Sequence, residues 1–213
     1  NTSNQFDYVI ITKPEFERSC EIFKSHKETA RDFSVIVTTV DQILAEFYDA
    51  ASTQENIREF IHYAGTNWHE PRAKYFLFAG DADALPNFKI IQNFGDELSD
   101  TAYSDFYYSV DKFDEDTLNV SYFVGRVAAR TIEELENYFS KVMNYEETEQ
   151  IEPWQNNTLF VADYDSTSGI VFENMAINIG DNLPSYLQNH FIFHNPESEY
   201  YGNKDSLANF VNN

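Results

Sequence analysis

Short apolar runs alternate with helical periodicity along most of the chain. The runs are rich in aromatic and β-branched residues and are too short for buried helices, which is typical of strands that are buried on both faces. We predict strands at Tyr8–Thr12, Phe33–Thr39, Tyr75–Ala79, Val120–Val124, Thr158–Ala162 and Phe191–Phe193.

Helical periodicity fills the intervals between these runs. Phe16, Cys20 and Phe23 recur at i, i+4 and i+7 after a proline, which predicts a helix with Cys20 on its buried face. Thr131 and Glu134 have the spacing of a capping box, and an apolar stripe follows them. Further helices are predicted around residues 41–47, from Thr53, at Ile170–Asn182 and at Lys204–Asn212.

The order of strands and helices predicts an α/β fold. Parallel strands need long crossovers, and the crossovers here have helical periodicity, so we expect a parallel sheet with helices on both faces. The acidic stretch Glu147–Pro153 is a candidate linker between subdomains. We divide the chain into a first α/β subdomain, residues 1–130, and a second, incomplete subdomain, residues 131–213.

Residues 87–109 show neither the alternation of a strand nor the periodicity of a helix. We interpret them as a long irregular loop over the edge of the sheet. An acidic stretch follows that contains Asp111, Asp114 and Asp116. Its spacing is not that of an EF-hand, but carboxylates on an irregular loop are suitable ligands for Ca²⁺. Two interpretations stay open, a calcium site formed by these three residues and an ordinary solvated turn.

The overall charge limits the classes of partner. The chain has 213 residues, of which 14 are Lys or Arg and 36 are Asp or Glu, and its formal net charge is −22. Such a surface repels phosphate groups, which argues against nucleic acid and anionic lipid as partners. No apolar run approaches about 18 residues, so we expect no membrane span.

Two charged residues, Asp81 and Arg126, stand out near predicted strand ends. Asp81 follows the strand Tyr75–Ala79 closely, at the carboxyl edge where ligands and catalytic groups of open α/β sheets gather. For Asp81 alone we favour a structural role, in which it accepts backbone N–H bonds from the next loop. Arg126 follows another strand, and we expect it to form a bidentate pair with Asp81 or Asp105.

Candidate nucleophiles and bases are few. Cys20 is the only cysteine, and a thiol on the buried face of a helix stays protonated and inert, so we do not expect it to be catalytic. His190 and His194 have the spacing to share one face of the last predicted strand. Such a pair suits metal binding or base catalysis, and the alternative is a solvent-facing pair.

One explicit catalytic motif occurs, at Asp163 and Asp165. A short apolar run followed by Asp-x-Asp-x-Thr resembles the nucleophile motif of haloacid-dehalogenase-type phosphatases, in which Asp163 would attack phosphorus and Asp165 would act as general acid beside Mg²⁺. Such enzymes usually carry this strand first and need a later lysine and a later acidic pair. Lys204 suits the lysine, but no acidic pair follows on a predicted strand.

An ordered series of motifs resembles the gingipain-type cysteine peptidases. A strand ends in Gly-Asp with Pro five residues after the Asp, and Ser-Asp-x-x-Tyr, Val-Gly-Arg and a helix with Lys-x-x-x-Tyr-Glu follow in order. A Trp before a hydrophobic strand continues the series. The residues that carry the resemblance are Gly80, Asp81, Pro86, Ser104, Asp105, Tyr108, Val124, Gly125, Arg126, Lys141, Tyr145, Glu146 and Trp154.

The resemblance implies two caspase-like lobes, peptide-bond hydrolysis by a Cys/His dyad, calcium binding, a polypeptide substrate, and secretion or a place at the cell surface. The family's Gly-His-Gly motif and its later cysteine do not occur in this sequence. We therefore expect the front portion of a peptidase catalytic region, ending before its dyad, structural and inactive by itself. Some gingipains carry an acidic residue, which binds a basic side chain, before the helix that contains Glu-Asn. The matching stretch Gly169–Asn174 has no acid at the aligned place, so arginine specificity does not carry over.

Two other functions stay open. One is a stand-alone, non-catalytic gingipain-like module for binding or scaffolding, and the other is the phosphatase that uses Asp163 and Asp165. A Gly-His-Gly motif and a cysteine downstream of Asn213 in the parent sequence would distinguish the peptidase fragment from the module.

Overall fold

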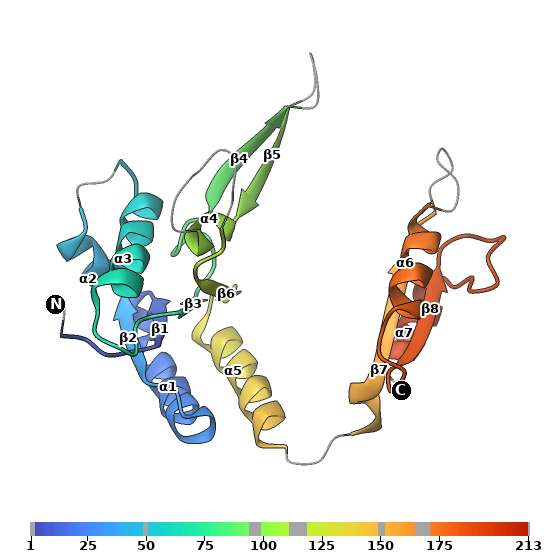
Figure 1. Ribbon diagram of the computed structural model, residues 1–213, viewed down its shortest axis with the longest axis horizontal. Helices are drawn as coiled ribbons and strands as arrows, with labels where there is room; N and C mark the ends of the chain where they lie inside the picture. The colour runs from blue at the N-terminus through green and yellow to red at the C-terminus, as the bar shows by residue number, and fades with distance from the viewer. Residues whose placement is uncertain are drawn as a thin grey trace. The chain divides into compact units, whose positions relative to one another are not determined.

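The computed structural model describes residues 3–48, 51–93, 99–110, 119–148, 152–164 and 171–212. The chain forms two compact units, Asn1–Thr148 and Glu149–Asn213 (Figure 1). The boundary falls inside the expected linker Glu147–Pro153 and not at residue 130. The reason is that helix α5 (Ile132–Glu147) packs against helix α1 (Glu17–Arg31), so α5 belongs to the first unit.

The first unit is built on a four-stranded sheet with the order β2-β1-β3-β6. Every neighbouring pair is parallel, which confirms the predicted α/β fold. In the register, Tyr8 lies beside Val35 and Tyr75, and Tyr75 lies beside Phe123. The strands are β1 (Tyr8–Thr12), β2 (Val35–Thr39), β3 (Tyr75–Ala79) and β6 (Phe123–Val127).

Strand β6 begins at Phe123 and not at Val120, where the apolar run begins. Val120 instead forms an isolated antiparallel bridge with Val110, which keeps the start of the run out of the parallel sheet. Tyr122 follows as a buried residue whose ring meets that of Phe76 edge-on at 5.6 Å. As a result, Arg126 lies within the strand and not after it.

The two faces of this sheet carry separate apolar cores, because successive residues of a strand point to opposite faces. Val9 and Ile11 of β1 join the core that holds side chains of α2 (Val40–Glu46) and α3 (Thr53–Asn67). Ile10 joins the core beneath α1 and α5. Helices on both faces are thus confirmed.

A β-hairpin replaces the irregular loop expected at residues 87–109. Strands β4 (Phe88–Asn93) and β5 (Ser99–Ser104) pair antiparallel, and the short helix α4 (Phe106–Ser109) follows. Figure 1 shows the two strands extending away from the four-stranded sheet, with α4 at their base. We call these two strands the β4–β5 ribbon.

The second unit contains a parallel pair of strands, β7 (Asn157–Ala162) and β8 (Gln188–Phe193). Helix α6 (Val171–Asp181) connects them, and α7 (Lys204–Asn212) follows β8. The rings of Phe160 and Phe191 stack across the two strands at 5.2 Å. Both predicted strands of the last third are therefore present, each longer than predicted at its amino end.

A partly buried ionic cluster joins α1 to α5. Lys27 donates to Oε1 of Glu146 at 2.5 Å, and Nε2 of His26 lies 2.9 Å from Oε2 of the same carboxylate. The side chains of Lys27, His26 and Glu146 are 10%, 8% and 14% exposed. Burial alone would raise the pKa of Glu146, but the hydrogen bonds from Lys27 and His26 hold it below its ordinary value.

Replacing Glu146 should destabilise the first unit in a pH-dependent way. Glu146→Gln removes the charged acceptor of Lys27 and should lower the free energy of unfolding by about 2 kcal/mol at pH 7. Because folding lowers the pKa of Glu146, its contribution is fully present above the ordinary value of 4.5 and is lost as the pH falls through the lower folded value. The stabilities of wild type and variant should therefore converge in acid.

Urea unfolding at pH 7 and in acid measures this difference. Glu21→Gln is the control, because Glu21 and Lys24 form a surface pair at 3.5 Å in which the Glu21 side chain is 50% exposed. Such a pair contributes at most about 1 kcal/mol. An effect of Glu146→Gln that is no larger than that of the control, or that grows in acid, would contradict the role given to Glu146.

Candidate functional site

The carboxyl ends of β1, β3 and β6 lie side by side, at Thr12, Ala79 and Val127. Just beyond β3, Gly80 donates its N–H to the carbonyl of Val127 at 2.9 Å. Gly80 has a φ of 150°, a conformation that L side chains rarely adopt, which explains the glycine at the turn out of the strand. This turn directs the chain toward the β4–β5 ribbon.

Arg126 holds the segments at this edge together. Its Nε and Nη2 donate to the two carboxylate oxygens of Asp105 at 2.7 and 2.8 Å, and its Nη1 donates to the carbonyl of Gly80 at 2.9 Å. The guanidinium also lies 4.9 Å from the ring centre of Phe78. We call this arrangement the Arg126 clamp. It joins β6, the turn after β3 and the segment after β5.

The clamp also has partners on the ribbon side. Asn87 donates to Oδ1 of Asp105 at 2.7 Å, and the Tyr108 hydroxyl donates to the carbonyl of Pro86. Burial raises the pKa of Tyr108, which keeps this hydroxyl protonated as a donor. Asp105 and Tyr108 of the Ser-Asp-x-x-Tyr motif thus fix the segment before β4 and the segment after β5 to the sheet.

Asp81 pairs with a residue that the sequence analysis did not single out. Nε of Arg130 donates to Oδ2 of Asp81 at 2.8 Å. Arg130 thus pairs with Asp81, and Arg126 pairs with Asp105. Desolvation would raise the pKa of Asp81, but hydrogen bonds from Arg130 and from the backbone of Asp83 hold it below its ordinary value. The signal for this pair was the second arginine of the VGRVAAR stretch, just before α5.

Cys20 lies on the buried face of α1, as its spacing predicted. It has no exposed surface, and burial raises its pKa to about 11, an effect that the Thr12 side chain reduces and the charges of Glu21 and Glu17 increase. No described contact joins the thiol to a histidine. At neutral pH it is therefore a protonated core side chain.

The carboxyl edge of the second unit brings Asp163 together with His194. Nδ1 of His194 lies 3.3 Å from Oδ1 of Asp163, and the two side chains are 66% and 83% exposed. Hydrogen bonds from the backbone of Tyr164 and from His194 lower the pKa of Asp163. Asp165, the second carboxylate of the phosphatase motif, lies outside the described residues.

The two histidines of this region do not act as a pair. Strand β8 ends at Phe193, so His194 lies beyond the strand, whereas His190 lies within it with its ring 4.8 Å from that of Phe210. His190 thus packs on α7 and His194 faces the Asp163 carboxylate. The two histidines thus have different described partners, and their shared face stays a prediction.

The predicted calcium ligands Asp111, Asp114 and Asp116 lie outside the described residues. Within the ranges that the structure covers, no group of three or more His, Cys, Asp or Glu side chains is arranged to hold a metal ion.

The described helices are all too short or too polar to cross a membrane.

Solved structures of peptidases resemble the chain. A complex of the pro- and mature domains of RgpB from Porphyromonas gingivalis covers 89% of this chain with a TM-score of 0.65 and 19% sequence identity. The Arg-specific cysteine proteinase gingipain R covers 90% with a TM-score of 0.65 and 17% identity. Dimeric latent PorU from Porphyromonas gingivalis covers 67% with a TM-score of 0.54 and 17% identity.

The chain spans only part of these proteins, 42% of each of the first two chains and 16% of PorU. At such identities the likeness shows the caspase-like fold alone, and no curated protein matches the chain. The model of peptidase family C25 matches residues 1–213. The chain therefore belongs to peptidase family C25, as its ordered motifs indicated.

Proposed function

We propose that the chain is the structural front part of a gingipain-type cysteine endopeptidase. The Cys/His dyad that hydrolyses the peptide bond is supplied by residues outside this sequence. The observation that carries the proposal is the state of Cys20, the single cysteine, which is fully buried with a pKa raised to about 11. A cysteine nucleophile needs a thiolate, an accessible sulfur and a base within reach.

The geometry supports a scaffolding role for the first unit. At the carboxyl edge of its sheet, the charged side chains of Asp81, Asp105, Arg126 and Arg130 are committed to one another. In this proposal the ion pairs give the edge rigidity and not chemistry. The substrate class is polypeptide, and the acidic chain is not a nucleic acid-binding protein. Secretion or a place at the cell surface follows from the resemblance.

The phosphatase that uses Asp163 and Asp165 receives no such support. The described polar contacts of the Asp163 side chain are with the backbone of Tyr164 and with His194, and Asp165 lies outside the described residues. The binding or scaffold module keeps the same fold and the same inert thiol as the peptidase fragment. Measuring peptidase activity in a longer polypeptide from the same gene distinguishes these two functions. Only the peptidase fragment gains peptidase activity when its downstream residues are present.

Cys20 should be dispensable for peptidase activity. The folded 213-residue chain should show no hydrolysis of casein and no labelling of Cys20 by a thiol-directed inhibitor, whereas labelling in urea should be complete. In the longer polypeptide, Cys20→Ala should keep the wild-type rate of casein hydrolysis, with Ser19→Ala, at the neighbouring buried residue, as control. Inhibitor labelling of folded Cys20 that disappears when a histidine is replaced would overturn the proposal.

Breaking the Arg126 clamp should loosen the carboxyl edge. Asp105→Asn removes the charge opposite Arg126, whose side chain is 11% exposed, and should cost about 3 kcal/mol of unfolding free energy, because a desolvated guanidinium loses its counter-charge. Glu70→Gln is the matched control, since the Glu70 side chain is 76% exposed and pairs with Arg72 at 3.4 Å.

Thermal melts of the two variants and of Arg126→Met with Asp105→Asn test the pair. We expect the double variant to be no less stable than Asp105→Asn, because it removes the buried charge as well as its partner. Equal melting midpoints for Asp105→Asn and the Glu70→Gln control would show that the clamp contributes nothing to the stability of the folded chain.

We further propose that the acidic stretch binds calcium through Asp111, Asp114 and Asp116. The proposal is supported by the net charge of −22 and by the suitability of carboxylates as Ca²⁺ ligands. Calcium at about a hundredfold over its dissociation constant should add about 2.7 kcal/mol of stability if it binds only the folded chain. Melting in calcium and in chelator measures it, and replacing the three aspartates by asparagine should abolish the shift. Equal midpoints for the wild type would refute the proposal.

A further inference from the structure

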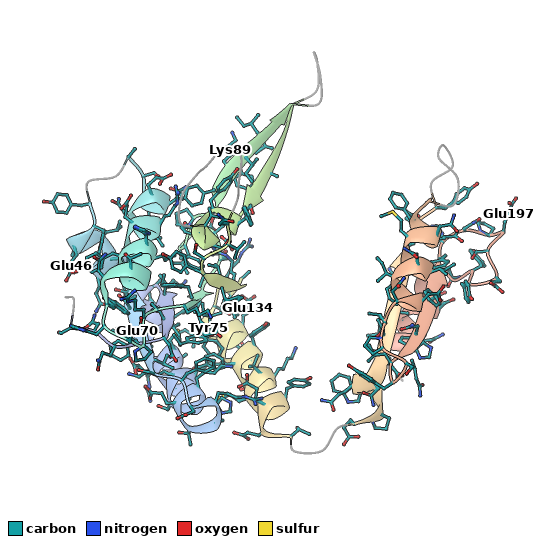
Figure 2. All side chains as sticks on the ribbon, viewed as in Figure 1. Glu46, Glu70, Tyr75, Lys89, Glu134 and Glu197 are labelled. Atoms are coloured by element: carbon teal, nitrogen blue, oxygen red, sulfur yellow. The ribbon has the colours of Figure 1, made fainter. Side chains whose placement is uncertain are left out.

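We draw no further inference here: the strongest candidate, the exposed apolar patch that Val161 of β7 forms with Phe172, Met175 and Ile179 of α6 on the second unit (Figure 2), carries no proposal, because nothing in the described part of the chain shows what covers it.

Discussion

The Arg126–Asp105 pair is the interaction on which the carboxyl edge of the first unit depends. A parallel sheet brings its loops to one edge without pairing them to one another, so side chains must position the β4–β5 ribbon. Arg126 supplies donors in a rigid fork, two to Asp105 and one to the Gly80 carbonyl. A lysine at this position would place a charge but would not fix two segments at once. Since both side chains are largely removed from water, neither is stable there without the other.

Cationic side chains that join separate segments recur elsewhere in the first unit, because cations are scarce in this chain. There are 14 Lys and Arg residues against 36 carboxylates, and several of the described cations lie where two elements meet. Lys27 joins α1 to Glu146 of α5, and Arg130 joins the start of α5 to Asp81 after β3. Each of these pairs links segments that are far apart in sequence.

The hydrophobic pattern predicted β1 and β3 to the residue, because both are central strands whose apolar runs coincide with their buried length. It missed the β4–β5 ribbon because Ile90 and Ile91 are adjacent and point to opposite faces, which removes the alternation of a half-buried strand. The partner of Arg126 was also undetermined, since Asp81 follows a predicted strand and Asp105 lies on the segment interpreted as an irregular loop, and neither pattern gives a distance to Arg126. Only the tertiary structure shows that Asp105 and the Gly80 carbonyl converge on one guanidinium.

The two units use the carboxyl ends of their strands in opposite ways. After β3, the acceptor capacity of Asp81 is taken by Arg130 and by the backbone of Asp83, so the edge of the first sheet is closed by ion pairs. After β7, the Asp163 side chain stays exposed, and its carboxylate lies beside His194, which is also exposed. Rigid, mutually neutralised groups suit a support, whereas accessible titratable groups suit chemistry or its control. The described ion pairs of the first unit therefore fix the segments that follow its strands, whereas Asp163 and His194 leave a polar, solvent-exposed edge after β7 in the second unit.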